Sequence, residues 1–343
     1  MSNTKFYYKE GKAGDFPYIE LGYAGEAHSH SVKIAVKEAS NMFSYIIDGD
    51  ETLYYDSQLP LRSFAVGMPL LFPFPNRITD AMYVWKGVTR LQKKDGIPIQ
   101  LHSMLNDETT FTNDAPVVTD KSASLTTRIR VDESHPIYLG FPFAFLLEFT
   151  FVVDENGVSV IHRLNNLSGE DMPYGIAYHP YFNKLSGEDE TIIHVPCTYM
   201  YEVKTDVEPA FFNKTAAGLG MVPNVMPTGN LLEVAGTDSD ILEPTPVGKL
   251  DLDTVYTSVA PNPPATIEYR KQGFTLSISG SEEYQHYVVF TPKGKSYFCI
   301  EPQTCSTDAV NLYAQGLEHV NLLVCPAKQN IEGVVHYNYT FKK

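Results

Sequence analysis

The sequence has no long hydrophobic run, few cysteines and a deficit of positive charge. No stretch approaches the ~18 consecutive apolar residues that a membrane-spanning helix needs, and the N-terminal MSNTKFYYKE lacks the apolar segment of a secretory signal peptide. The four cysteines form no C-x-x-C pair, so neither a disulfide framework nor a structural zinc site is expected. These absences favour a reduced, cytoplasmic protein with no membrane partner.

The charge balance restricts the classes of partner. With 26 basic and 41 acidic side chains, the net charge is 26 − 41 = −15. The electrostatic field of this negative charge repels phosphate backbones and anionic lipid head groups, so nucleic acids are not expected as partners. The sequence also lacks a P-loop, a dinucleotide-binding fingerprint and a G-x-S-x-G elbow. Neutral polar small molecules remain as candidate ligands.

Apolar and polar residues alternate with period two across most of the chain. The alternating runs are short, rich in β-branched and aromatic residues, and bounded by turn sequences such as Asp154-Glu-Asn-Gly. We expect strands at Val32–Val36, Leu125–Val131, Phe145–Val153, Val158–Leu164, Phe274–Ser279, Tyr287–Phe290 and Tyr297–Glu301. Many short strands without interleaved helices predict an all-β fold, a large antiparallel β-sandwich formed by a single domain over residues 1–343.

Three segments call for separate predictions. Ser306 or Thr307 is expected to cap one short helix that ends at Gly316. Residues 203–248 alternate weakly and contain several prolines, which predicts a loop-rich excursion bordering a binding cleft. The pair His28-Ser-His30 has no further metal ligands near it in sequence, so we expect a solvated loop and no metal site.

Polar residues beside aromatic or proline-rich stretches are the candidates for chemistry. Asn76 and Arg77 follow Pro69-Leu-Leu-Phe-Pro-Phe-Pro, whose stiff backbone would hold an amide beside a guanidinium, although an arginine there can also close a loop against carboxylates. His102 ends an apolar segment, as core and edge histidines also do. His179 lies among tyrosines, whose faces suit either a sugar or an aromatic core.

Two carboxylates complete the set of candidates. Glu301 ends an apolar strand and is followed by a proline that is expected to stop the ladder, so its carboxylate is paired, functional or exposed at the strand end. Asp253, within Asp251-Leu-Asp-Thr-Val-Tyr256, either accepts hydrogen bonds from ligand hydroxyls or lies in an exposed turn.

In their order along the chain, these segments resemble the aldose 1-epimerase (galactose mutarotase-like) family. The resemblance rests on Asn76-Arg77-Ile78, Leu101-His102, His179-Pro-Tyr-Phe-Asn183, Leu252-Asp253 and Phe298-Cys-Ile-Glu-Pro-Gln-Thr304. It implies a β-sandwich with an open cleft, no cofactor, no metal, and an isomerase that interconverts the α and β anomers of free sugars. By motif, it implies Glu301 as general base, His179 as general acid, His102 as a second active-site histidine, and Arg77, Asn76 and Asp253 as sugar-binding residues.

The implied reaction removes a proton from the C1 hydroxyl and adds one to the ring oxygen. A carboxylate base and a histidine acid on opposite sides of the ring would do both, and each contributes ~10²–10⁴-fold. This pairing predicts a bell-shaped pH–rate profile.

Three alternatives remain open at the level of sequence. A hexose-6-phosphate 1-epimerase would need basic side chains at the rim of the site, for which the nearest candidates are Lys86, Arg90, Lys93 and Lys94. A glycoside hydrolase would use Glu301 and Asp253 as its carboxylate pair. A carbohydrate-binding protein without catalytic activity would use the same kind of sandwich. In each case we expect a monomer or a homodimer.

Overall fold

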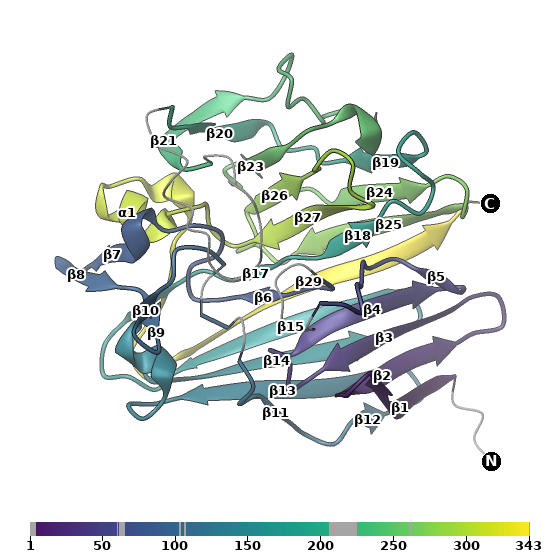
Figure 1. Cartoon of the computed structure of the whole chain (residues 1–343), viewed down its shortest axis with the longest axis horizontal. Helices are drawn as coiled ribbons and strands as arrows, with labels where there is room; N and C mark the ends of the chain where they lie inside the picture. The colour runs from purple at the N-terminus through teal and green to yellow at the C-terminus, as the bar shows by residue number, and fades with distance from the viewer. Residues whose placement is uncertain are drawn as a thin grey trace.

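The structure, a computed structural model, describes residues 5–59, 61, 66–102, 104–105, 108–205, 225–260 and 262–342. Strands dominate it, and every strand pair among these residues is antiparallel (Figure 1). None of the helices in the described ranges is long and apolar enough to cross a membrane.

The largest sheet contains the strands with the clearest alternation. Every second side chain is buried in β13 (Ala123–Val131) and β14 (Phe145–Val153), as their sequences predict. The long strand β29 (Asn330–Phe341) lies between β15 (Gly157–Asn166) and β25 (Phe274–Gly280). The remaining strands of this ten-stranded sheet are β11 (Thr112–Asn113), β12 (Val117–Val118), β19 (Thr191–His194), β22 (Thr245–Pro246) and β24 (Ala265–Tyr269).

Two smaller sheets pack against this layer. The five-stranded sheet runs in chain order through β1 (Phe6–Ala13), β2 (Phe16–Ala24), β3 (Ser29–Ala35), β4 (Asn41–Ile47) and β5 (Asp50–Glu51). The eight-stranded sheet is built from β6 (Leu70–Leu71), β17 (Ala177–Tyr178), β18 (Tyr181–Asn183), β20 (Tyr199–Val203), β21 (Pro227–Glu233), β23 (Asp253–Thr257), β26 (His286–Phe290) and β27 (Tyr297–Gln303). Strand β2 packs on β13 and β14, and β27 packs on β25.

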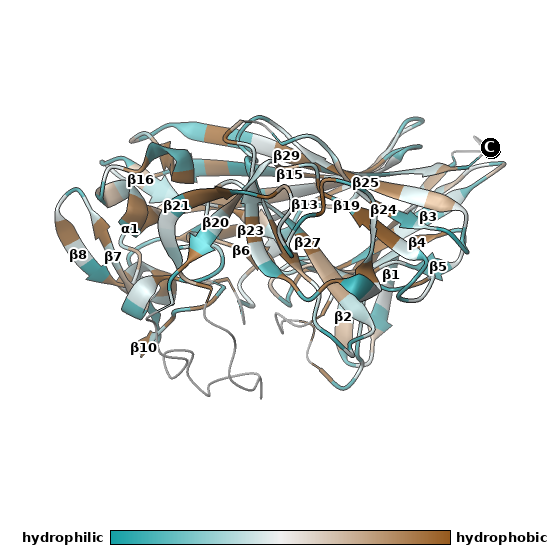
Figure 2. Ribbon diagram, turned by 90° about the horizontal axis from the view of Figure 1, so that it is seen from above, coloured by the Kyte–Doolittle hydropathy of each residue, from teal (hydrophilic) through white to brown (hydrophobic). Residues whose placement is uncertain are grey.

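The core lies between these layers, and Figure 2 shows hydrophobic and hydrophilic residues following one another along the strands. A single cluster of buried apolar residues includes Val32 of β3, Phe149 of β14 and Val289 of β26, so all three sheets contribute to it. The segment that follows β5 also contacts the eight-stranded sheet, because the Tyr54 amide donates to the Tyr181 carbonyl of β18 over 2.7 Å. The predicted all-β antiparallel sandwich is confirmed.

Short elements complete the chain. Three strand pairs stand apart from the large sheets: β7 (Met82–Trp85) with β8 (Val88–Leu91), β9 (Lys93–Lys94) with β10 (Ile97–Pro98), and β16 (Met172–Tyr174) with β28 (Leu323–Cys325). Single 3₁₀ turns occur at Thr79–Ala81, Pro136–Leu139, Val247–Lys249 and Glu318–Val320. In the described ranges, the one α-helix is α1 (Ala309–Ala314).

Several sequence predictions need correction. The helix begins after Asp308 and not after Ser306 or Thr307. Asp308 has φ 56°, which lies outside the right-handed helical region, so the helix cannot extend to earlier residues. Strand β27 does not stop at Glu301: it continues to Gln303, and Pro302 lies opposite Tyr287 in the ladder. An antiparallel strand alternates between hydrogen-bonded and non-hydrogen-bonded positions, so a single proline can be accommodated.

Two further predictions are wrong in part. His30 does not lie in a solvated loop: it belongs to β3, is buried, and contacts the Tyr339 hydroxyl at 2.9 Å and the Gly157 carbonyl at 3.1 Å. His28 lies just before β3, and its half-exposed ring contacts Asp48 at 2.6 Å. The proposed excursion at 203–248 includes the regular strand β21, and residues 206–224 lie outside the described ranges.

Candidate active site

Backbone pairing brings the segments of Asn76 and His102 together. Arg77 forms an isolated bridge with Leu101, and the His102 amide donates to the Asn76 carbonyl over 2.6 Å. Asn76 has φ 61° and His102 has φ 55°, so two non-glycine residues in the left-handed region face each other across this contact. Such conformations concentrate at functional sites, where the surrounding structure enforces them.

His179 and Glu301 reach the same place from adjacent strands. Strands β17 and β18, on either side of His179, both pair with β27, which carries Glu301. Nε2 of His179 lies 3.2 Å from Oε1 of Glu301, and the two residues are only 4% and 2% exposed. A ring cannot fit between atoms this close, so the expectation that they act from opposite sides of a sugar is wrong. They lie side by side.

Aromatic contacts fix the orientation of the His179 ring. The ring stacks on Tyr181 with centroids 4.6 Å apart and planes 16° from parallel. The His102 ring meets it edge-on at 4.9 Å and 88°. With one ring stacked on it and another against its edge, the imidazole is held toward Glu301.

Arg77, Asn76 and Asp253 form the second half of the constellation. Arg77 Nη1 donates to Asn76 Oδ1 over 2.8 Å, and Nη2 lies 3.6 Å from Asp253 Oδ2. The Arg77 side chain is 5% exposed, whereas that of Asp253, the first residue of β23, is 18% exposed. The Arg77 charge also acts on Glu301, which joins the two halves. The structure thus brings together all the residues implied by the resemblance.

Burial shifts both members of the His179–Glu301 pair toward their neutral forms. Loss of solvent raises the pKa of Glu301 well above its ordinary value, and the nearby Asp253 charge adds to this, while Gln303 and Arg77 oppose it. Loss of solvent likewise lowers the pKa of His179 to about 3. Between them, the two groups therefore hold one proton over a wide range of pH.

The same effect acts on the neighbouring charges. Desolvation raises the pKa of Asp253 and lowers that of Arg77, and in each case the partner's charge opposes the shift. Desolvation also lowers the pKa of His102 well below its usual range, with the nearby charges of His179 and Arg77 adding to it. His102 is therefore a neutral neighbour of the pair.

Sequence reasoning assigned no role to two further residues on β27. Gln303 donates from Nε2 to Oε2 of Glu301 over 3.3 Å, so it contacts the carboxylate oxygen that does not face His179. Cys299 lies on the other side of Glu301, and burial raises the pKa of its thiol well above the usual range. The period of two along a strand would have indicated both, since residues 299, 301 and 303 share one face.

Asp308 is a third residue that sequence reasoning missed. Its amide donates to the Arg77 carbonyl over 3.0 Å, and its carboxylate accepts from Thr79 Oγ1 over 2.6 Å. It therefore ties the start of α1 to the segment that carries Arg77. The contact joins positions 229 residues apart, so no local pattern in the sequence could have indicated it.

The donor set that could hold a metal ion is His179, Cys299 and Glu301. One ligand atom from each lies within 4.8 Å of the other two, and all three residues are buried. No other such group occurs among the residues that the structure describes.

Comparison with known proteins relates this chain to a family. The sequence model of the aldose 1-epimerase family matches residues 53–318, a range that contains all the candidate residues. The Escherichia coli protein YihR is 20% identical over 248 residues, which is 71% of each chain.

Solved structures share the fold at low sequence identity. A galactose mutarotase-like protein from Clostridium acetobutylicum has a TM-score of 0.81 at 18% identity, covering 99% of this chain and 100% of the other. A putative aldose 1-epimerase from E. coli K12 has a TM-score of 0.70 at 15% identity, covering 98% and 100%. A galactose 1-epimerase from Lactobacillus acidophilus has a TM-score of 0.70 at 14% identity, covering 99% and 100%. The sequence match over residues 53–318 shows that this chain belongs to the aldose 1-epimerase family.

Proposed function

We propose that this protein is an aldose 1-epimerase, a mutarotase that interconverts the α and β anomers of a free hexose by acid/base opening and closure of the ring. The observation that carries the proposal is the buried contact of 3.2 Å between His179 Nε2 and Glu301 Oε1. The ring oxygen and the C1 hydroxyl are both bonded to C1, so two groups side by side can reach both oxygens at once.

Ring opening moves two protons. Glu301, as carboxylate, takes the proton of the C1 hydroxyl, and His179, as imidazolium, gives a proton to the ring oxygen. The bond between C1 and the ring oxygen breaks with its electron pair on that oxygen, and C1 becomes the aldehyde carbon. After rotation about C1–C2, His179 takes the proton back as the C5 hydroxyl attacks the other face of the carbonyl, and Glu301 returns a proton to O1.

The pair holds one proton at every stage of this cycle. It is charged on both members while the sugar is closed, and neutral on both while the sugar is an open-chain aldehyde. Burial favours the neutral pair, because it raises the pKa of Glu301 and lowers that of His179. The unliganded pair is therefore neutral, so Glu301 must first pass its proton to His179 before it can act as the base, and ring opening returns the pair to the form that burial favours.

The remaining residues would hold the sugar. Arg77 and Asn76 offer hydrogen-bond donors, and the carboxylate of Asp253 offers an acceptor at the more exposed side of the site. With orientation supplied by these groups and proton transfer by the pair, the reaction needs neither a metal nor a cofactor.

Polarimetry on freshly dissolved sugars tests the proposal. We expect the protein to accelerate the drift in rotation of at least one of α-glucose and α-galactose. Glu301→Gln and His179→Asn should each slow this reaction by ~10²–10⁴-fold. Glu332→Gln is the matched control, because Glu332 forms an exposed ion pair with Arg163 at the surface. A wild-type rate equal to that of buffer for every hexose would refute the proposal and leave a carbohydrate-binding protein without catalytic activity.

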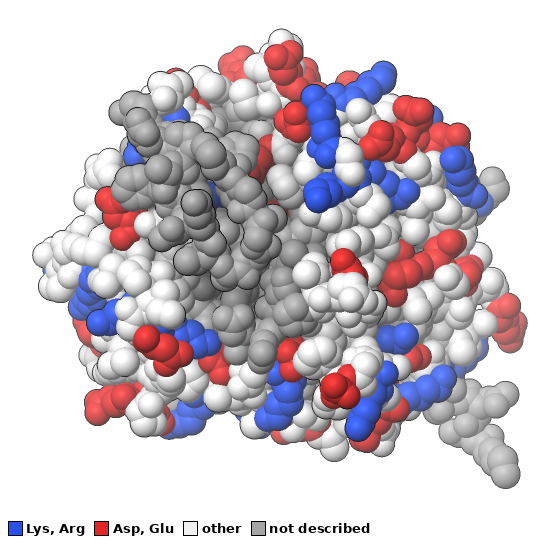
Figure 3. Space-filling view, viewed as in Figure 1, with Lys and Arg blue, Asp and Glu red and all other residues white. Residues whose placement is uncertain are grey.

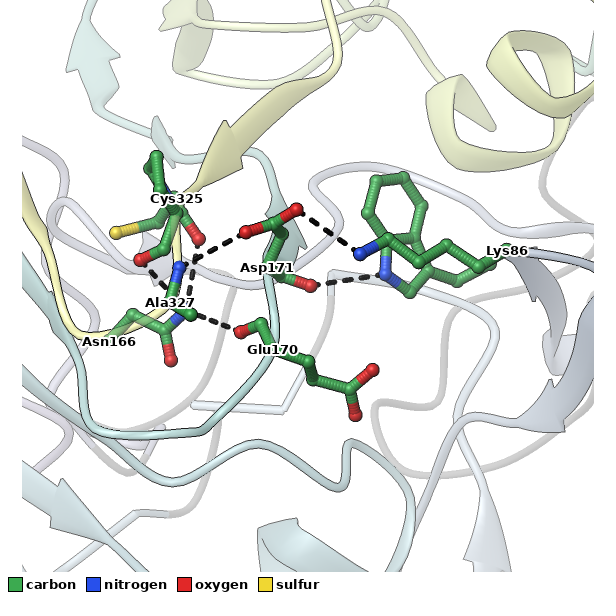
Figure 4. A network of polar contacts seen from close by, with 8 residues as sticks. Lys86, Asn166, Glu170, Asp171, Cys325 and Ala327 are labelled. Atoms are coloured by element: carbon green, nitrogen blue, oxygen red, sulfur yellow. Dashed lines mark hydrogen bonds and ion pairs between the residues drawn. The ribbon is translucent and has the colours of Figure 1, made fainter.

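A hexose 6-phosphate is the second candidate substrate, and acidic partners beside two of its four predicted binding residues, Lys86 and Lys94, argue against it. Lys86 Nζ lies 3.1 Å from Asp171 Oδ2, and the same aspartate accepts from the Ala327 amide (Figure 4). Lys94 Nζ lies 3.1 Å from Glu108 Oε2. Figure 3 likewise has acidic and basic side chains interspersed on the face that it draws. The anomers of glucose 6-phosphate, run beside those of glucose, decide between the two substrates.

A glycoside hydrolase would need Asp253 as the second carboxylate. Asp253 instead lies 3.6 Å from the Arg77 guanidinium, which supports a role in binding. Incubation with a disaccharide separates the two activities, because only a hydrolase releases additional reducing sugar from it.

A further inference from the structure

Three side chains that could bind a metal ion lie together in the candidate site, and the proposed anomer exchange uses only two of them. Cys299 and Glu301 are two positions apart on β27, so their side chains share one face of the strand. Cys299 also pairs in register with Tyr181 of β18, two positions after His179. This pairing delivers a thiol, a carboxylate and an imidazole to one buried spot, where one ligand atom of each lies within 4.8 Å of the others.

The three donors match the ligand preferences of a soft or borderline divalent cation. Zinc binds thiolate, imidazole and carboxylate with bonds of about 2.0–2.3 Å, so donors in a tetrahedral site lie about 3.5 Å apart. His179 and Glu301 are already at 3.2 Å, and adjustments of the side chains would bring the third donor into range. A fourth position would be left for water.

The charges also balance. A thiolate and a carboxylate offset the two positive charges of the ion, and the imidazole is a neutral ligand. The Arg77 guanidinium beside the cluster is itself offset by Asp253 at 3.6 Å. A buried site with no net charge avoids most of the desolvation penalty that an unbalanced ion would meet.

We propose that His179, Cys299 and Glu301 form an inhibitory site for a thiophilic divalent cation such as Zn²⁺. Binding releases two protons to solvent, one from the thiol and one held by the His179–Glu301 pair, and no oxidation or reduction is involved. The bound ion occupies both proton-transferring groups and stops anomer exchange. The inhibition rests on the proposed function, whereas the binding does not.

Cobalt titration tests the binding alone, and Cys299→Ala removes the sulfur ligand. Co²⁺ bound to a thiolate gives a sulfur-to-metal charge-transfer band. We expect the band in wild type and in Cys305→Ala, a matched control whose thiol is equally buried outside the cluster, and its absence in Cys299→Ala. Cys299→Ser provides the same test if the alanine variant does not fold. No band in wild type, or an unchanged band in the Cys299 variants, overturns the site.

Inhibition is then measured by polarimetry with added Zn²⁺. Zn²⁺ should stop the wild type, EDTA should restore it, and Mg²⁺, which prefers oxygen ligands, should have no effect. Mutation of groups that only hydrogen-bond the ligands of a metal site lowers metal affinity by about 10–100-fold. Loss of a ligand itself should cost at least as much, so Cys299→Ala should need at least about tenfold more Zn²⁺ for half-inhibition. Equal sensitivity of the two proteins overturns the proposal. If no hexose is epimerised at all, the proposed function fails while the cobalt titration still decides the site.

Discussion

At the scale of single residues, Glu301 and His179 act as one titrating unit. Their atoms are 3.2 Å apart, and a proton gained by one group changes the charge that the other experiences. The bell-shaped pH–rate profile expected from the sequence therefore reports the pair, and not either residue alone. Its acid limb corresponds to a second proton entering the pair, and its alkaline limb to the loss of the last one.

Burial separates the two limbs of this profile. The pKa of His179 is lowered to about 3, so the acid limb should lie below the ordinary histidine value of 6.5. The raised pKa of Glu301 should place the alkaline limb above the ordinary value of 4.5. The pH dependence of kcat/KM checks both limits, and an acid limb at or above 6.5 would contradict the shared-proton account.

Gln303 should tune the alkaline limb. Its N–H donates to Glu301 Oε2 over 3.3 Å, and a hydrogen bond to the ionised form lowers the pKa of a carboxyl group. Gln303→Met removes that donor at similar size, so the pKa of Glu301 should rise and the alkaline limb should move to higher pH. A kcat/KM profile with an unmoved or lowered limb would show that Gln303 has no such effect.

Asp253 should contribute to binding more than to proton transfer. It is the partially exposed partner of Arg77, and hydrogen bonds to charged groups contribute about 1.5–3 kcal/mol, so Asp253→Asn should reduce kcat/KM by about tenfold or more, mainly through KM. Asp251→Asn is the matched control, since Asp251 pairs with Lys293 at the surface two positions earlier. Equal KM values in the two variants would place Asp253 outside the sugar site.

At the scale of elements, β27 organises the site. It pairs with β26 along one edge and with β17 and β18 along the other, so His179, which directly follows β17, is carried to Glu301. The alternation predicted this strand up to Glu301 but not its continuation through Pro302, which depends on where the proline lies relative to β26. Ladder position is a property of two strands, so one strand's sequence does not determine it.

The contact between α1 and the Arg77 segment should be important for sugar binding. Thr79→Val removes the hydrogen bond from Oγ1 to Asp308 Oδ2, leaves a buried carboxylate without one of its donors, and should lower the free energy of unfolding by about 1–3 kcal/mol. Because the Asp308 amide also donates to the Arg77 carbonyl, KM should rise as that segment loosens.

Urea unfolding and steady-state kinetics measure the two effects of Thr79→Val. Thr119→Val is the control, since the Thr119 side chain makes only exposed turn contacts, with Lys121 and Ser122. Loss of stability with an unchanged KM would mean that Asp308 supports the fold and not the position of Arg77.

At the scale of the whole molecule, alternation predicts the strands well but not their arrangement. Buried and exposed positions in β13 and β14 follow the sequence residue by residue. Candidate site residues were recognisable because short motifs surround them, and the period of two along β27 would have indicated Cys299 and Gln303 as well. Asp308 instead acquires its role from a contact between positions 229 residues apart. His30 was predicted to be solvated because its neighbours in the sequence are polar. Packing against other parts of the chain buries it.

Buried histidines should make the fold sensitive to acid. Burial lowers the pKa of His30 to about 4 and those of His162 and His286 to about 3. The unfolded chain binds protons on these histidines below pH 6.5 while the folded chain does not, so stability should be full above 6.5 and fall as the pH drops toward the folded pKa values.

The size of this effect can be checked with one variant. At pH 4.5, a histidine whose folded pKa is about 3 accounts for roughly 3 kcal/mol of lost stability. The difference in unfolding free energy between pH 7 and pH 4.5 should therefore be smaller in His162→Gln than in wild type. An identical difference in the two proteins, measured by urea unfolding, would contradict the linkage.

The most direct test of the account is exchange NMR on an equilibrium mixture of the α and β anomers of a hexose labelled with ¹³C at C1. We predict that the protein transfers magnetisation between the two anomeric signals far faster than buffer does, and that Glu301→Gln and His179→Asn each abolish most of the gain. Exchange no faster than in buffer for every hexose tested, or full exchange in both variants, would show that the His179–Glu301 pair does not open the sugar ring.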